Sequence, residues 1–168
     1  MVIARNQPDY EDMKWKPAPI IKVYEALGSL ADGRVGLDGH SAKVHSSSGN
    51  KYYDVAYDPA ENAIASNDND SFWQGYLGYP SIAVLLALGK IDYGPRLPEF
   101  LKGFAWEDLN QQFKNDFIKT QNFIDTAVAK KHSIGTAQFH ALLESVQIQV
   151  NALGLNKLAS TKRPPKAY

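Results

Sequence analysis

The segment from Lys51 to Leu88 constrains the fold of this 168-residue chain more than any other. Apolar and polar residues alternate over 51–66, which predicts a β-hairpin with one buried face. A polar loop rich in aromatic residues follows, with the sequence SNDNDSFWQGYLGY from Ser66 to Tyr79. The next segment, 80–88, is almost wholly apolar and predicts a buried helix. The three parts together predict a hairpin, a loop and a helix that pack as one unit.

The residues before this segment extend the prediction to an α+β fold. Apolar residues recur at helical spacing between Pro19 and Asp32, and Gly33 follows where a helix stop is expected. Alternating residues at 35–37 and 42–44 predict two further strands. We therefore expect a small antiparallel sheet of three or four strands, with one face covered by helices.

Two longer helices are predicted in the C-terminal half. One apolar stripe runs from Trp106 to Val128, and a second runs from Thr136 to about Leu153. A short turn at 132–135 separates them, so we expect an antiparallel helix hairpin. A linker rich in Gly and Pro, 89–104, precedes the hairpin and marks a subdomain boundary.

These patterns divide the chain into four parts. Residues 1–17 form a flexible N-terminal arm, for which Trp15 is a candidate anchor. Residues 18–104 form the α+β core, and residues 105–154 form the helix hairpin packed on it. Residues 155–168 form a basic tail, which is expected to be flexible because two adjacent prolines forbid a helix there.

The composition excludes several classes of function. The chain has no cysteine, which removes disulfides, thiolate metal sites and cysteine nucleophiles. Its 18 basic and 18 acidic residues cancel, so no overall field favours nucleic acid or an anionic membrane. The N-terminal segment lacks a secretory signal, and no apolar run nears the roughly 20 residues of a membrane span. We expect a cytoplasmic protein that needs no cofactor and contacts no membrane.

The strand VAYDPAENA before Ile64, the following loop and the apolar helix together resemble the SWIM zinc-binding domain over about residues 34–89. In that family, a Cys-x-Cys pair ends a strand and a Cys-x-His pair opens an apolar helix. Here Ser66 and Asp68 occupy the first pair of positions, and Tyr79 and Ser81 occupy the second. The resemblance implies a degenerate SWIM-type module that binds DNA or proteins and has no catalytic residues.

Serine, tyrosine and a single aspartate cannot replace the thiolate and imidazole ligands of structural zinc. We therefore predict no metal site, and we expect the four degenerate ligand positions to lie near one another around packed aromatic rings. The candidate rings are Phe72, Trp73, Tyr76 and Tyr79. The oxygen-rich run SNDND before them predicts a turn with Asx hydrogen bonds, or a cap on a short helix at Ser71, in preference to a cation site.

The aromatic cluster has two interpretations. The favoured one is a core plug between the sheet and the helices. The alternative is a stacking or peptide-binding surface, and half exposure of Trp73 and Tyr76 would support it.

Basic residues are a further candidate for binding nucleic acid or a partner. Lys162, Arg163 and Lys166 lie in the tail, where they either contact phosphate or an acidic partner or are merely solvated. Three residues of the sheet region would extend one basic face if they align, namely Arg34, Lys43 and Lys51.

The sequence leaves three functions open. The favoured one is a non-enzymatic interaction module for nucleic acid or a partner protein. The second is a structural homodimer formed through the C-terminal helices, seeded by Ile118, Ile134 and Ile148. The third is a small-ligand or enzyme pocket, because no catalytic motif is present but several polar side chains could converge. Those side chains are Asp68, Asp70, Tyr79, His40 and Tyr57.

Overall fold

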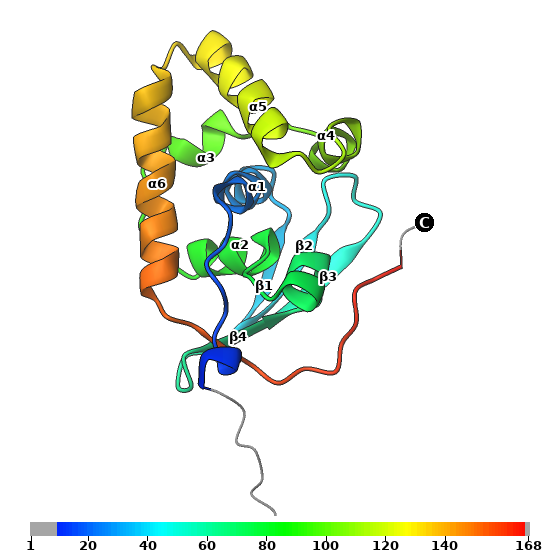
Figure 1. Cartoon of the computed structure of the whole chain (residues 1–168). Coiled ribbons are helices and arrows are strands. Elements are labelled where there is room, and N and C mark those ends of the chain that lie inside the picture. The colour runs from blue at the N-terminus through cyan, green and yellow to red at the C-terminus, as the bar shows by residue number, and fades with distance from the viewer. Residues whose placement is uncertain (1–9, 167–168) are drawn as a thin grey trace, which may run out of the picture.

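The computed structural model describes residues 10–166 and shows an α+β fold (Figure 1). The strands are β1 (Val35–Asp38), β2 (Ser41–His45), β3 (Tyr52–Asp58), β4 (Ala63–Ser66) and β5 (Asn156–Lys157). The longer helices are α1 (Ile20–Ala31), α2 (Tyr79–Ala87), α5 (Phe117–His132) and α6 (Thr136–Ala152). The shorter ones are η1 (Tyr10–Met13), η2 (Asp70–Gln74), α3 (Leu97–Phe100) and α4 (Trp106–Gln112).

The five strands form one sheet in the order β1-β2-β3-β4-β5. The first four pair antiparallel, with Val44 opposite Tyr53 and Tyr57 opposite Ile64, which confirms the predicted sheet. The fifth strand pairs parallel to β4 and comes from the segment predicted as a flexible tail. Two residues are too few to show a period of two, so the sequence pattern gave no signal for β5.

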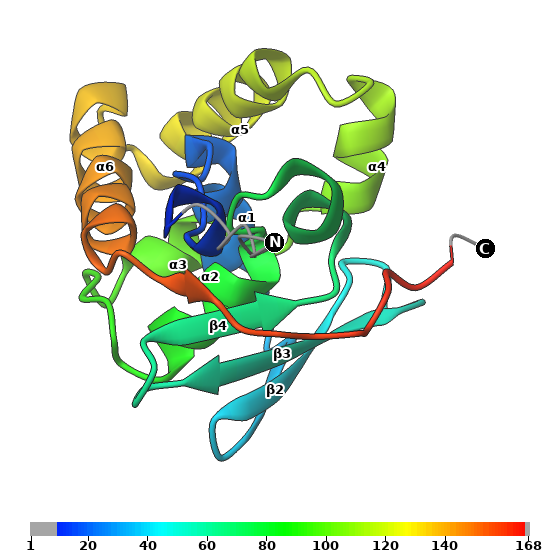
Figure 2. The same cartoon turned by 60° about the horizontal axis from the view of Figure 1, so that its bottom comes forward.

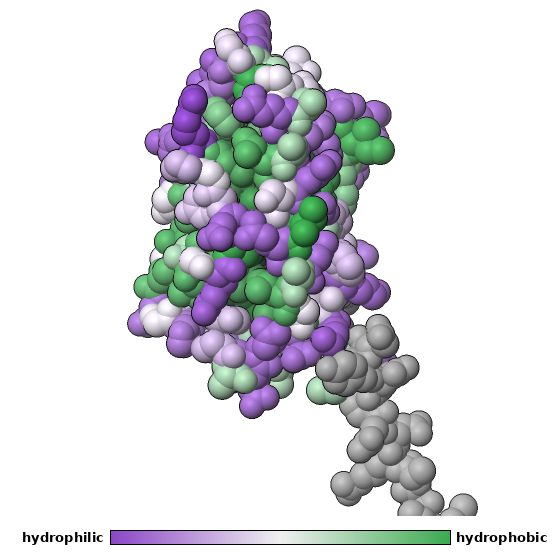
Figure 3. All heavy atoms as spheres, turned by 90° about the vertical axis from the view of Figure 1, so that its left-hand side faces the viewer, coloured by the Kyte–Doolittle hydropathy of each residue, from purple (hydrophilic) through white to green (hydrophobic). Residues whose placement is uncertain are grey.

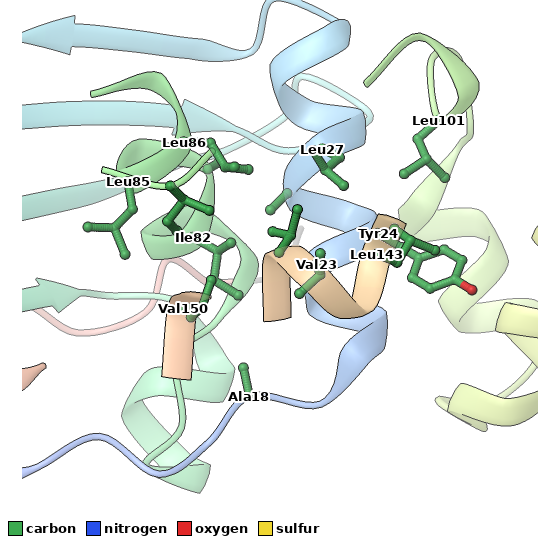
Figure 4. Packing of buried hydrophobic residues seen from close by; sticks show 14 of the residues in the cluster. Ala18, Val23, Tyr24, Leu27, Ile82, Leu85, Leu86, Leu101, Leu143 and Val150 are labelled. Atoms are coloured by element: carbon green, nitrogen blue, oxygen red, sulfur yellow. The ribbon is translucent and has the colours of Figure 1, made fainter. Parts of the chain in front are cut away.

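The helices lie on one face of the sheet, and the other face is open (Figure 2). α2 contacts strands β1 to β4 on one side and α1 on the other, so its residues from Pro80 to Leu86 are all buried. This position explains why its sequence is apolar all round and not amphipathic. α1 packs in turn against α3 and α6. Figure 4 shows the resulting core, in which side chains of α1 meet those of α2 and α6.

The prediction of one long helix from Trp106 to Val128 is wrong, because the structure has two helices there, α4 and α5. Lys114 and Asn115 between them have φ values of 51° and 59°, in the left-handed region that ends a helix. The Asp116 side chain then accepts a hydrogen bond from the Lys119 N–H and caps α5. The apolar stripe continues across the break, which is why its periodicity alone predicted one helix.

Both ends of the described chain lie along β4. The indole Nε1 of Trp15 donates a hydrogen bond to the Ile64 carbonyl at 2.9 Å, and the Trp15 backbone N–H donates to Leu155. Leu158 N–H donates to the same Ile64 carbonyl, and the Asn67 amide donates to the Arg163 carbonyl at 3.0 Å. The N-terminal arm and the tail therefore contribute to the sheet edge over the residues that the structure describes.

Apolar side chains on the outer surface of the helix layer are scattered. Figure 3 shows a mosaic of polar and apolar side chains on the face that carries α6. Ile118 and Ile148 are 73% and 67% exposed, whereas Ile134 is partly buried against the core and is not free to seed a dimer. Among residues 10–166, no helix is both long and apolar enough to cross a membrane.

Candidate functional site

A polar cleft of about 720 Å³ lies where four parts of the chain meet. Its walls are the first half of α1, the segment 46–53, the loop 68–79, and α4 with the turn that follows it. We call it the central cleft. Its volume is in the range of pockets that hold metabolites or cofactors.

Two charged residues of α1 face this cleft although the helix is buried. Lys22 is 5% exposed and Glu25 is 2% exposed. Lys22 Nζ lies 2.8 Å from Asp70 Oδ2 and 3.4 Å from Glu25 Oε1. Asn110 of α4 donates from Nδ2 to Glu25 Oε1 at 3.2 Å, and the Tyr76 hydroxyl donates to Asp70 Oδ1 at 2.9 Å. The network thus joins α1, the loop and α4 across the cleft.

This network is held in a defined ionisation state. Burial alone would lower the pKa of Lys22, but the carboxylates of Glu25 and Asp70 outweigh burial and leave that pKa above its ordinary value. Burial together with the Asp70 charge raises the pKa of the Tyr76 phenol. Lys22 is therefore a cation and Tyr76 a neutral donor at physiological pH.

The opposite wall carries a second ion pair. Lys51 Nζ lies 3.0 Å from Glu107 Oε1. Burial would raise the pKa of Glu107, but hydrogen bonding to Ser48 and Lys51 lowers it below its ordinary value. The rings of Tyr53 and Tyr79 stack edge to face beside this pair, with centroids 6.1 Å apart. Burial raises the pKa of both phenols, so they remain neutral.

Asp68 organises the loop at the base of the cleft. Its carboxylate accepts hydrogen bonds from the Ser71 N–H at 3.0 Å and from the Ser71 hydroxyl at 2.7 Å. The Ser71 hydroxyl in turn accepts from the Gly78 N–H at 3.3 Å, which ties the start of the loop to its end. Burial raises the pKa of Asp68. Of the two predicted roles of this run, the Asx hydrogen bond is confirmed at Asp68, whereas Asn69, the residue that precedes the π-helical turn η2, makes no side-chain cap.

The degenerate ligand positions do not fit a zinc ion. Ser66 and Asp68 are neighbours, since the Asp68 N–H donates to Ser66 Oγ, and Asp68 lies against Gly78, next to Tyr79. However, the Asp68 carboxylate is engaged by Ser71, and Ser81 Oγ is buried within α2 without a partner. Among the described residues, no cluster of three or more His, Asp or Glu side chains has a geometry that could hold a metal.

The aromatic cluster is divided between core and surface. The core-plug expectation is right for Tyr79, which packs against the core, and wrong for two other rings. Phe72 is 41% exposed and Trp73 is 69% exposed, and the two stack edge to face with centroids 4.7 Å apart. The π-helical turn η2 aims Asp70 and Gln74 into the cleft and leaves Phe72 and Trp73 outside it.

The candidate basic residues do not gather on one face. Arg34 is mostly buried and donates from Nη1 to the His45 carbonyl, and Lys51 lies in the central cleft. Lys43 and Lys162 border a different groove, on the open face of the sheet, where Lys162 pairs with Asp54 at 3.3 Å. Arg163 and Lys166 are exposed in the tail beyond. The basic face that the sequence analysis considered is therefore not formed.

The predicted ligand pocket is formed in part. The structure brings Asp68, Asp70 and Tyr79 to the central cleft, as that alternative expected. His40 is exposed in the turn between β1 and β2, where its ring packs on Tyr57, and neither residue lines the cleft. Lys22 and Glu25 were not among the site residues predicted from the sequence. The signal for them was two opposite charges three residues apart in a helix whose other residues predicted burial.

Fold and site together define an α+β protein with a polar, charge-paired cleft beside a buried helix. The chain belongs to the family described as Uncharacterised conserved protein UCP014422, whose model matches residues 15–156. The matched range contains every residue that lines the cleft. No curated protein and no solved structure matches the chain. The SWIM resemblance therefore remains a sequence-based prediction.

Proposed function

We propose that this protein binds a small polar ligand in the central cleft. The observation that carries the proposal is the pair of charged residues on α1, Lys22 and Glu25, which are almost fully buried yet line an open cleft. The absence of cysteine fits a protein that works in the cytoplasm.

The energetics of buried charges support this function. Removing an ion pair from water costs several kcal/mol per ion, so well-packed apolar side chains at the same positions are often equally or more stabilising. In a protein that binds no ligand, Lys22, Glu25 and Asp70 would add little to the free energy of unfolding. A ligand gains a prearranged set of donors and acceptors, whose positions are fixed before binding.

Isosteric neutralisation of this network separates stability from binding. We expect the triple variant Lys22→Met, Glu25→Gln, Asp70→Asn to unfold at about the same denaturant concentration as the wild type, because the three charges are removed together and no buried charge is left unpaired. The same variant should lose ligand binding. A variant that is strongly destabilised would instead assign the network to the stability of the fold.

Ligands can be found by thermal shift with a panel of sugars, polyols, amino acids and nucleosides. A compound that binds the native state raises the melting temperature with concentration. Gln111→Trp should abolish that rise, because Gln111 lines the cleft from the exposed side of α4 and a tryptophan there fills the opening. Gln112→Trp is the matched control, since its exposed neighbour Gln112 does not line the cleft. Equal shifts in both variants would place the ligand elsewhere and contradict the proposal.

The exposed Phe72–Trp73 pair favours a second candidate function, the binding of nucleic acid or a partner protein predicted from the sequence. An exposed aromatic ring suits base stacking. Titration with single-stranded oligothymidylate should quench the fluorescence of Trp73, and the quenching should weaken as salt rises. Trp73→Phe removes this signal and leaves those of Trp15 and Trp106. No difference between wild type and Trp73→Phe at low salt would exclude the nucleic-acid function.

A further inference from the structure

We infer that the ligand of the central cleft is a neutral saccharide, an inference that rests on the proposed function and names its ligand class. The first observation is that the deep charges of the cleft already have partners within the protein. Lys22 is paired with Glu25 and Asp70, and Lys51 is paired with Glu107. A charged ligand would have to displace one of these partners, whereas a neutral ligand can hydrogen-bond to the pairs as they stand.

The second observation is the kind of group that remains available. Four exposed residues with side-chain amides line the cleft, namely Asn69, Gln74, Gln111 and Asn115, and none of these amides hydrogen-bonds to another described residue. A fifth amide, that of Asn110, donates to Glu25 while its Oδ1 atom is buried without a partner among the described residues. The only lysine of the cleft without an ion-pair partner among the described residues is Lys114, which is exposed at the rim.

Amides both donate and accept hydrogen bonds, as do the hydroxyl groups of a sugar. A carboxylate accepts only and an ammonium donates only, so a cleft for an anion or a cation would be lined by unpaired groups of one type. The side-chain amides without a protein partner, which both donate and accept, lie on two walls of the cleft. Gln74 is on the loop, and Gln111 and Asn115 are on the wall formed by α4 and the turn after it. This distribution matches a ligand with hydroxyl groups around its circumference.

The aromatic residues of the cleft also suit a saccharide. Four aromatic residues line the cleft, namely Tyr53, Tyr76, Tyr79 and Phe117, and the rings of Tyr76 and Phe117 are half-buried. A pyranose has hydroxyls at its edge and an apolar C–H face, which packs on an aromatic ring. The combination of half-buried rings with free amides favours a saccharide over a peptide or a free amino acid, which carry charged or main-chain groups at fixed spacing.

Saturation-transfer NMR with the full chain tests this inference, because it detects weak binders directly. The neutral probes are glucose, N-acetylglucosamine and maltotriose, and the charged probes are glucuronate, glucose 6-phosphate and lysine. We expect transfer to at least one neutral sugar and about tenfold weaker binding of its charged counterpart, since the added charge finds no free partner. Gln111→Trp and, from the other wall, Gln74→Trp should both abolish the signal, and Gln112→Trp should keep it.

The outcomes separate the inference from the function on which it rests. If a charged probe binds, Gln111→Trp abolishes its binding and no sugar binds, the assignment of the ligand as a saccharide is overturned. The cleft would remain a ligand site in that case. Sugar binding that survives both cleft variants would overturn the inference, because the sugar would lie outside the cleft. No binding of any probe, together with no thermal shift from the wider panel, would overturn inference and function together.

Discussion

At the scale of single residues, Gly78 shows how closely the loop and α2 approach each other. A Cβ atom built on Gly78 would lie 2.0 Å from Asp68 Oδ1, far inside van der Waals contact. Asp68 is buried and cannot move away without breaking its hydrogen bonds to Ser71. The absence of a side chain at residue 78 is therefore required for the loop to close on itself.

We expect Gly78→Ala to lower the free energy of unfolding by about 2 kcal/mol or more, because overpacking here displaces a buried carboxylate. Urea denaturation measures the change. Gly94→Ala is the control, since a Cβ at Gly94 meets no heavy atom within 4 Å and should leave the midpoint nearly unchanged. Equal midpoints for the two variants would contradict the close approach of Asp68 and Gly78.

At the scale of elements, one polar chain joins three helices. The Tyr24 hydroxyl of α1 donates to Asp125 Oδ1 of α5 at 2.7 Å. His140 Nε2 of α6 lies 2.6 Å from Asp125 Oδ2. Tyr24 belongs to the apolar core, and its oxygen points away from the aliphatic side chains around it (Figure 4). Asp125 thus gives the buried phenol its partner and fixes the helix hairpin to α1.

Replacing Asp125 by alanine should cost about 3 kcal/mol of unfolding free energy, because the buried Tyr24 hydroxyl loses its carboxylate acceptor and His140 loses its partner. Chemical denaturation followed by circular dichroism measures the loss. The neighbouring Thr126→Ala is the control, because Thr126 is exposed and bonds only within its own helix, to Asn122. Its effect should stay within about 0.5 kcal/mol. A loss of similar size in both variants would show that Asp125 does not join the helices.

At the scale of the whole molecule, the buried polar groups make stability depend on alkaline pH. Burial raises the pKa of the Tyr24 and Tyr79 phenols above the ordinary value of 10.0, and the carboxylates of Glu25 and Asp70 raise that of Lys22 above 10.5 against the opposing effect of burial. The unfolded chain releases these protons at the ordinary values, while the folded chain retains them. The stability that these three groups contribute is therefore complete below pH 10 and falls as the pH rises beyond it.

Urea midpoints measured at several pH values on either side of 10 should reveal this fall. Tyr79→Phe removes one of the contributing protons, so its midpoint should decline less steeply with pH than that of the wild type. The readout is the slope and not the absolute stability, which the substitution also changes through packing. Identical slopes would show that Tyr79 keeps an ordinary pKa in the folded chain.

Elements whose signals are local in the chain could be predicted from the sequence alone. The period of two over 35–66 predicted β1 to β4, and apolar stripes predicted α1 and α6, because side-chain periodicity directly reflects which face is buried. The continuous apolar run over 80–88 predicted α2 as a helix buried on all sides. The sequence also predicted the turn at Asp68, since an Asp side chain readily accepts a hydrogen bond from a backbone N–H a few residues further on.

The remaining features depend on tertiary contacts. β5 exists because β4 offers an unpaired edge to residues far along the chain, and α4 separates from α5 because the backbone turns at Lys114 and Asn115. Lys22 and Glu25 became a candidate site only when the loop brought Asp70 to them and α4 brought Asn110. Trp73 is exposed because the turn of η2 directs Asp70 and Gln74 inward. Each of these depends on contacts between distant residues, which local periodicity does not encode.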